Sequence, residues 1–204
     1  MSTLITIPMK NLSECKTRLS GSLSEKARSD LARLLYVRTL EFIKPLAFQN
    51  GFDVAVVTRS QEAVSIAKAF ELKIIPEPIS GTLSKAAKLA SEWACINGYE
   101  QLCLIPADLV APDKEEMTNF LKSKASVTIC PSIDQGTNAL MLSPPNAIDF
   151  HYGPQSALAH FNSANVAGLK PVFMHLESIS FDLDHTDCLN RAYSLVPEIR
   201  EVCK

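Results

Sequence analysis

Three aspartates that are far apart in the sequence have the chemistry of ligands for a divalent cation. Asp108 follows the apolar run 101–105 (QLCLI), and Asp182 and Asp184 belong to the acidic segment FDLD. If residues 179–184 are extended, Asp182 and Asp184 share one face about 7 Å apart, where their like charges favour a cation between them. Mg²⁺ fits because it prefers hard oxygen ligands and shares its coordination shell with phosphates. The alternative is structural: Asp184 caps the last helix, Asp182 lies on the surface and Asp108 stabilises a turn.

A group of cations follows the first apolar run, 3–7 (TLITI). Lys10 comes shortly after Pro8, and Lys16 and Arg18 lie in the sequence KTRL. Cations in a loop between a strand and a helix are suited to binding the oxygens of polyanionic phosphates, and arginine can contact two oxygens at once. The sequence therefore predicts a phosphate-binding loop here, with a solvated basic loop as the alternative.

Two further segments combine a turn with polar side chains. The sequence DQGTN (134–138) predicts a glycine-led turn whose N–H groups, with the Thr137 hydroxyl, could bind an oxyanion. The sequence FHYGPQS (150–156) ends at a predicted helix start, with Ser156 in the first turn. Unpaired N–H groups and the helix dipole favour a bound phosphate or carboxylate there. An ordinary turn and an ordinary helix cap are the alternatives.

Other catalytic patterns are absent from the sequence. The histidines at 151, 160, 175 and 185 lack metal-ligand spacing, and His160 is expected to be a packed or capping residue. Neither a Walker loop nor a G-x-S-x-G nucleophile elbow occurs, which argues against P-loop kinases and serine hydrolases. The six cysteines form no C-x-x-C pair, and Cys103 and Cys130 are expected to pack as reduced, small hydrophobic groups.

The elements that must position these residues alternate along the chain. A capping box, Ser22 to Glu25, predicts the start of a long first helix. Strands are predicted at 3–7, 54–57, 72–75, 101–105, 127–130, 138–142 and 172–175, and helices at 22–48, 61–71, 83–96, 112–122, 155–165 and 186–201. This alternation predicts an α/β fold in which a mostly parallel sheet is covered by helices on both faces. Such sheets bind ligands at the carboxyl ends of their strands.

Composition limits the remaining function classes. The chain has 204 residues, of which 47% are hydrophobic and 21% charged, and its net charge is −2. We expect a single domain over residues 1–204, with no basic field for nucleic acid or a polybasic membrane contact. No apolar run approaches the roughly 18–20 residues that cross a bilayer. The first residues do not read as a signal peptide. A cytoplasmic location is expected because the cysteines are expected to be reduced and structural.

The ordered set of motifs resembles a known family. P-x-K, K-T-R-L, P-A-D, G-T-N-A-L, F-x-Y-G-x-x-S and F-D-x-D occur in this order between Pro8 and Asp184. Together they resemble the 2-phospho-L-lactate guanylyltransferase family, which is similar to the MobA-type nucleotidyltransferases. The resemblance implies a three-layer, Rossmann-like fold of the GT-A kind. It also implies a Mg²⁺-dependent enzyme that transfers GMP from GTP to a three-carbon phosphate acid and releases pyrophosphate, in coenzyme F-420 biosynthesis. The same resemblance points to a downstream transferase as the enzyme that would receive the product.

The resemblance also assigns roles by position. The implied metal ligands are Asp108, Asp182 and Asp184. The implied contacts to the acid are Thr137, Gly153 and Ser156. The implied nucleotide contacts are Pro8, Lys10, Lys16 and Arg18. The implied catalytic residues are Lys16, Arg18 and Asp108. The chain departs from the family in having Ser84 where asparagine is usual near the guanine base, and Val110 where proline is usual.

Two other functions fit the same fold. A molybdopterin guanylyl- or cytidylyltransferase usually carries a glycine-rich first loop, whereas residues 9–20 contain no glycine. A catalytically silent nucleotide-binding protein would be expected to have lost at least one of the three aspartates. The acceptor acid stays open between 2-phospho-L-lactate, phosphoenolpyruvate and 3-phosphoglycerate.

Overall fold

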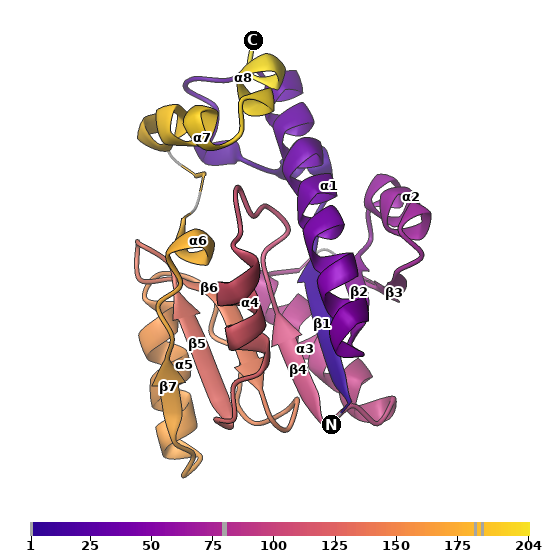
Figure 1. Ribbon diagram of the computed structural model, residues 1–204, viewed down its shortest axis with the longest axis vertical. Coiled ribbons are helices and arrows are strands. Elements are labelled where there is room, and N and C mark those ends of the chain that lie inside the picture. The colour runs from indigo at the N-terminus through magenta and orange to yellow at the C-terminus, as the bar shows by residue number, and fades with distance from the viewer. Residues whose placement is uncertain (1, 79–80, 182, 185) are drawn as a thin grey trace.

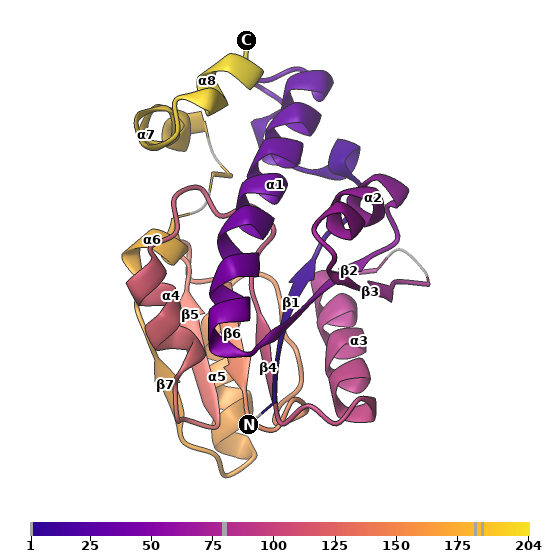
Figure 2. The same ribbon diagram turned by 45° about the vertical axis from the view of Figure 1, so that its right-hand side comes forward.

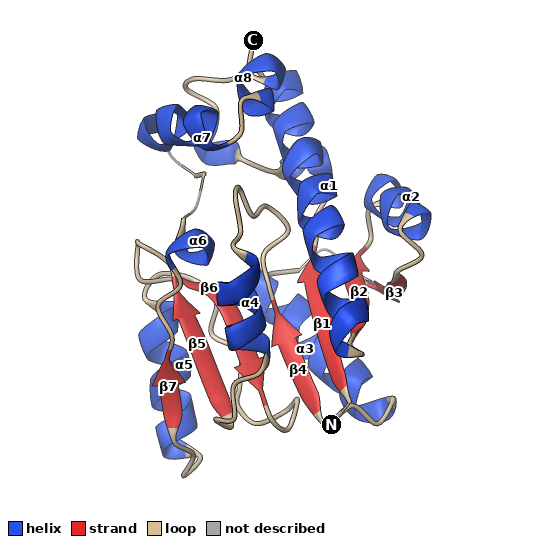
Figure 3. Cartoon of the chain, in the orientation of Figure 1, coloured by secondary structure: helices blue, strands red, loops and turns tan. Residues whose placement is uncertain are grey.

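A central sheet organises the computed structural model, which describes residues 2–78, 81–181, 183–184 and 186–204. The sheet has the strand order β3-β2-β1-β4-β6-β5-β7 (Figure 3). Strand β6 is antiparallel to both of its neighbours, β4 and β5, and the other neighbouring pairs are parallel. The strands are β1 (Thr3–Pro8), β2 (Asp53–Thr58), β3 (Lys73–Pro76), β4 (Gln101–Leu104), β5 (Val127–Pro131), β6 (Thr137–Leu142) and β7 (Pro171–Phe173).

Helices cover both faces of this sheet (Figures 1 and 2). One face packs against α1 (Glu25–Asn50), α2 (Gln61–Ala69), α4 (Lys114–Leu121) and α6 (Glu177–Ser180). The other face packs against α3 (Leu83–Ile96) and α5 (Ser156–Val166). The predicted α/β fold, with a mostly parallel sheet between two helical layers, is therefore confirmed.

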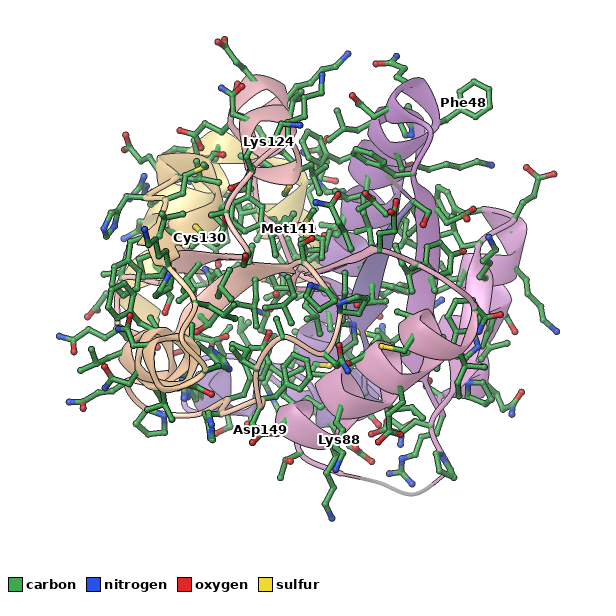
Figure 4. All side chains as sticks on the ribbon, turned by 90° about the horizontal axis from the view of Figure 1, so that it is seen from below. Phe48, Lys88, Lys124, Cys130, Met141 and Asp149 are labelled. Atoms are coloured by element: carbon green, nitrogen blue, oxygen red, sulfur yellow. The ribbon has the colours of Figure 1, made fainter. Side chains whose placement is uncertain are left out.

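The strands feed both cores because successive side chains point to opposite faces. In β1, Ile5 and Ile7 pack toward α1 whereas Leu4 packs toward α3, and all three are fully buried. Met141 and Cys130 also lie inside the fold, as Figure 4 shows, whereas Phe48 projects into solvent. The burial of Cys130, and of Cys103 in β4, agrees with the expectation that these thiols pack as small hydrophobic groups.

A third hydrophobic cluster joins the two ends of the chain. The C-terminal helices α7 (Leu189–Leu195) and α8 (Glu198–Val202) lie against the first half of α1 (Figure 1). Leu19, from the loop after β1, and Leu183, from the segment before α7, are fully buried in this cluster. The cluster therefore fixes the backbone on which Arg18 and Asp184 are carried.

Three local expectations from the sequence were wrong. The cap of α1 is Ser24, whose Oγ accepts a hydrogen bond of 3.1 Å from the N–H of Ala27, and Ser22 instead contacts Thr186. The segment 179–184 is not extended throughout, because its first two residues end α6. The predicted last helix is broken into a 3₁₀ turn, α7 and α8, with Pro197 at the start of α8, where its missing N–H costs no helical hydrogen bond. No helix in the described ranges is both long and apolar enough to span a membrane.

Candidate active site

One cleft collects most of the predicted site residues. It has a volume of about 570 Å³ and lies where β1 and β4 end and β6 begins. Because β6 runs antiparallel to β4, its first residue, Thr137, lies at the same edge of the sheet as the carboxyl ends of β1 and β4. Of the predicted residues, the cleft is lined by Pro8, Lys10, Lys16, Arg18, Asp108, Thr137 and Asp184. Gly153 and Ser156 do not line it.

The side chain of Lys16 connects the two described aspartates. Its Nζ donates hydrogen bonds of 2.5 Å to Asp108 Oδ2 and 3.2 Å to Asp184 Oδ1. Arg18 donates from Nη1 to the other oxygen of Asp184, at 3.1 Å. Asp108 and Asp184 thus converge on one cation, although 76 residues separate them in the sequence.

The conformation of Lys16 directs its side chain inward. Its backbone is left-handed (φ 52°) and precedes a 3₁₀ turn, Thr17–Leu19, whose Leu19 is anchored in the third cluster. The Lys16 side chain is only 3% exposed, whereas those of Asp108 and Asp184 are 36% and 37% exposed. Burial alone would lower the pKa of Lys16, but the charges of the two carboxylates outweigh it and raise that pKa above its usual value. Lys16 is therefore a cation at neutral pH.

The chemistry of these groups suits a divalent cation. Asp108 and Asp184 present hard oxygen ligands beside one cleft, and Mg²⁺ is commonly held by one or two carboxylates together with substrate phosphates and water. Within the described residues, no group of three or more acidic, histidine or cysteine side chains is close enough to hold a metal by itself. The third expected ligand, Asp182, lies outside the described residues. A metal held by Asp108 and Asp184 would complete its coordination shell with further oxygen ligands, such as water or substrate phosphates.

Two of the predicted acid-binding residues, Thr137 and Ser156, form a hydrogen-bonded group with His160 in which Thr137 lines the cleft and the other two lie behind it. Ser156 Oγ donates to Thr137 Oγ1 at 3.1 Å, and both residues are buried. His160, which is fully buried on α5, lies 3.0 Å from the same Thr137 oxygen through Nδ1. Gly153 has a φ of +143°, a conformation that side chains rarely adopt, so its backbone can form the turn that leads to Ser156.

The turn before Thr137 differs from its prediction. The N–H of Gly136 is not free, because it donates to Asp134 Oδ1 at 3.3 Å, and the N–H of Ser132 donates to the Gly136 carbonyl. The left-handed residue of the turn is Gln135 (φ 68°) rather than the glycine. A hydrogen bond from Ser132 lowers the pKa of Asp134, which lies 4.0 Å from Arg18. This turn closes a hairpin and contributes Thr137 to the site, and the Gly136 N–H that the sequence offered to an oxyanion is bonded within the turn.

Sequence reasoning missed one residue that lines the cleft, Glu77, and one contact that supports its wall. Glu77 lines it directly after β3, where partial burial raises the pKa of its carboxyl group. The rule that ligands bind at the carboxyl ends of strands could have found it. Ser84, at the start of α3, accepts a hydrogen bond of 2.9 Å from the N–H of Tyr152, which also lines the cleft. Ser84 therefore ties α3 to the loop that precedes Ser156, a contact that no sequence pattern indicates.

Comparisons with known proteins agree with this architecture. Residues 3–192 match the family described as guanylyl transferase CofC like. The 3-phospho-D-glycerate guanylyltransferase of Colwellia psychrerythraea is 35% identical over 211 aligned positions, covering 100% of this chain and 99% of the relative. The 2-phospho-L-lactate guanylyltransferase of Methanobrevibacter smithii is 26% identical, covering 90% of this chain and 80% of the relative. The phosphoenolpyruvate guanylyltransferase of Conexibacter woesei is 27% identical, covering 98% and 91%.

Solved structures show the same fold at lower identity. A candidate nucleotide-diphospho-sugar transferase of Desulfovibrio desulfuricans G20 superposes with a TM-score of 0.70 at 17% identity, covering 100% of this chain and 97% of that one. A nucleotidyl transferase of Methanothermobacter superposes with a TM-score of 0.64 at 13% identity, covering 97% and 99%. The fold is thus the Rossmann-like fold of nucleotidyltransferases.

Proposed function

The chain belongs to the guanylyl transferase CofC-like family, and from this premise we propose that it transfers GMP from GTP to a phosphorylated three-carbon acid. The acceptor that we propose first is 3-phospho-D-glycerate, because the relative that acts on it matches this chain over its whole length at 35% identity. 2-Phospho-L-lactate and phosphoenolpyruvate are the other acceptors to test.

The observation that carries this proposal is the arrangement of charge in the cleft. Lys16 and Arg18 lie on one side with Asp108 and Asp184, and the Thr137 hydroxyl lies on the cleft wall formed by β6. Two phosphate-bearing substrates repel each other, so a site that joins them needs cations between and beside them. The cations serve the triphosphate, and the hydroxyl serves the carboxylate or phosphate of the acid.

The reaction needs no general base from the protein. A phosphate oxygen of the acid is already ionised near pH 7, because the second pKa of a phosphate is about 6. This oxygen attacks the α-phosphorus of GTP, a new P–O bond forms, and the bond to the β-phosphate oxygen breaks. Pyrophosphate leaves with the bonding electrons, and Lys16 and Arg18 are placed to neutralise its charge.

Asp108 and Asp184, with Asp182 as the further expected ligand, would hold Mg²⁺ beside the phosphates. The ion would supply positive charge to the transferring phosphoryl group and its leaving group. Lys16 contacts both described carboxylates, so it would have to give up part of these contacts when the metal binds. Its amino group would then be free to contact the triphosphate.

Pyrophosphate release tests the proposal. The protein is incubated with GTP and Mg²⁺ and, in separate reactions, each of the three acids, with ATP and CTP as alternative donors and EDTA as the metal control. Release that needs an acid, GTP and the metal supports the proposal. Release only with molybdopterin as acceptor would indicate the related nucleotidyltransferases, and no release with any acceptor would indicate a silent nucleotide-binding protein.

A place in coenzyme F-420 biosynthesis is part of the same proposal. A phosphate acid joined to GMP is an activated donor, so the next enzyme in such a route would be a transferase that displaces GMP. Mass spectrometry of the product, followed by its use as a donor in that second reaction, tests both this role and the proposed hand-over.

A further inference from the structure

We propose that His160 is a positioning residue that holds the Thr137 hydroxyl as a hydrogen-bond donor toward the acid substrate. The proposal rests on the proposed function for the identity of that substrate. It starts from the position of His160, which is fully buried behind the cleft wall and does not line the cleft. The side chain can therefore act on a substrate only through a neighbour.

The first step is the protonation of the His160 ring. The backbone N–H of His151 points at Nε2, with an N···N distance of 2.9 Å. A backbone amide can only donate, so Nε2 must be the unprotonated, accepting nitrogen. The proton of the neutral ring is therefore on Nδ1. Burial, with a smaller contribution from His151, lowers the pKa of His160 to about 4, which keeps the ring neutral at physiological pH.

The second step concerns the Thr137 oxygen. Nδ1 of His160 lies 3.0 Å from Thr137 Oγ1, and with its proton on Nδ1 the ring donates to that oxygen. Ser156 Oγ donates to the same oxygen at 3.1 Å. A hydroxyl oxygen has two acceptor positions, and both are then filled. The hydroxyl hydrogen of Thr137 is left to be donated.

The third step is where that hydrogen can go. None of the contacts recorded for Thr137 within the described ranges accepts it, and Thr137 lines the cleft. Carboxylate and phosphate oxygens are pure acceptors at neutral pH, so they need a donor in a fixed orientation. A hydroxyl that can rotate would also present its lone pairs to the anion, which is repulsive. Fixing the orientation of the hydroxyl before the substrate binds avoids this repulsion and the entropy cost of ordering the group. His160 thus holds the Thr137 hydroxyl as a hydrogen-bond donor toward the acid.

Two substitutions test the roles of the two ring nitrogens of His160 separately. In His160→Gln, the amide oxygen can replace Nε2 as the acceptor for the His151 N–H, but no donor remains near Thr137. In His160→Asn, the shorter amide can place an N–H near the former Nδ1, and the His151 contact is lost. We expect His160→Gln to raise the KM for the acid by about tenfold or more and to change the KM for GTP by less than about twofold. His160→Asn should recover most of that loss.

The substitution His160→Gln in a Thr137→Val background distinguishes a role of His160 in orienting the Thr137 hydroxyl from a role in packing. If His160 acts through the hydroxyl, His160→Gln adds nothing to the acid KM once that hydroxyl is absent. Equal rises in both KM values, or a full additional loss in the Thr137→Val background, would overturn the proposal. Thermal unfolding of each variant verifies that it is folded.

Nitrogen-15 NMR of the histidine rings in the wild-type protein gives a test that needs neither a variant nor a substrate. The proposal requires the Nδ1–H tautomer for His160, and the Nε2–H tautomer would overturn it. A wild-type protein that is inactive with every acid would instead contradict the proposed function. The two failures are therefore distinguishable.

Discussion

Lys16 donates a hydrogen bond of 2.5 Å to Asp108, which lies 92 residues further along the chain. Its ammonium group also lies 3.2 Å from Asp184, so one buried cation separates two carboxylates that would otherwise repel each other. This is the charge arrangement that the sequence predicted for a metal ion, with the protein's own lysine as the cation. A metal ion bound as proposed would therefore compete with the lysine for the same oxygen atoms.

Replacement of Lys16 by methionine should separate these roles. We expect Lys16→Met to reduce kcat by about a hundredfold or more, because the charge of the leaving pyrophosphate is less well neutralised. We also expect Mg²⁺ to raise the melting temperature of the variant more than that of the wild type, because the ion no longer displaces an ammonium group. Thermal unfolding with and without MgCl₂ measures this. Lys44→Met, which breaks an exposed pair with Glu71, is the matched control. If Mg²⁺ raised the melting temperatures of the wild type and of Lys16→Met equally, the proposed competition between lysine and metal would be contradicted.

Neutralising either described carboxylate should abolish turnover without unfolding the chain. We expect Asp108→Asn and Asp184→Asn each to reduce kcat by at least about a hundredfold, because a metal ligand and a partner of Lys16 are lost together. Both carboxylates are more than a third exposed, but Lys16 is buried and keeps only one of its two partners, so the free energy of unfolding should fall by about 1–3 kcal/mol and leave the chain folded. Steady-state kinetics and chemical denaturation measure the two effects. Asp187→Asn, an exposed aspartate close by in the sequence, should retain activity.

Glu77 should help to select guanine. Its carboxyl group lies at the cleft beside Gly81. The two residues are so close that a side-chain Cβ at position 81 would be 3.5 Å from Glu77 Oε1. A carboxylate can accept from both the N1–H and the 2-amino group of guanine, whereas adenine lacks these donors. We expect Glu77→Gln to lower kcat/KM for GTP by about tenfold and to leave that for ATP nearly unchanged. Glu92→Gln, on the exposed side of α3, is the control. An equal loss with both nucleotides would show that Glu77 does not read the base.

His160 should make the protein less stable in acid. Its pKa is about 4 in the folded protein and about 6.5 in an unfolded chain, so the unfolded state binds the proton more readily. The resulting stability is complete above pH 6.5 and is lost as the pH falls toward 4, by up to about 3 kcal/mol. Chemical denaturation at several pH values should show this loss in the wild type and not in His160→Asn. His175→Asn, at an exposed histidine, should behave as the wild type. Parallel pH profiles for wild type and His160→Asn would contradict the assignment.

The fold was predictable because its signals are local. The run TLITI and the helix over residues 83–96 follow from β-branched and amphipathic patterns, and the alternation of such elements predicts a mostly parallel sheet. The direction of β6 was not assigned from the sequence, although the five residues between β5 and β6 are too few for the crossover that joins neighbouring parallel strands, so an antiparallel hairpin was predictable. That direction decides that Thr137 enters the site from the start of a strand rather than from its end.

The site was predictable in its residue types and less so in its contacts. Asp108, Asp184, Lys16 and Arg18 were identified by charge and by their positions next to predicted strands and helices. Their pairing depends on the left-handed backbone of Lys16, a conformation that no residue preference would assign to lysine. His160 was expected to be a packed or capping residue, and its burial confirms that it packs, but its two hydrogen bonds, with Thr137 at the start of β6 and with the His151 N–H in the loop before α5, depend on how these elements pack together.

The joining of Leu19, Leu31 and Leu183 to α7 and α8 in one hydrophobic cluster has a consequence for biosynthesis. On the ribosome, the face of α1 that carries Leu31 stays partly uncovered until residues 189–199 have been synthesised. The cluster that supports the loops carrying Arg18 and Asp184 is completed only then. A nascent chain released before α8 should therefore bind hydrophobic dyes and hold no defined nucleotide pocket.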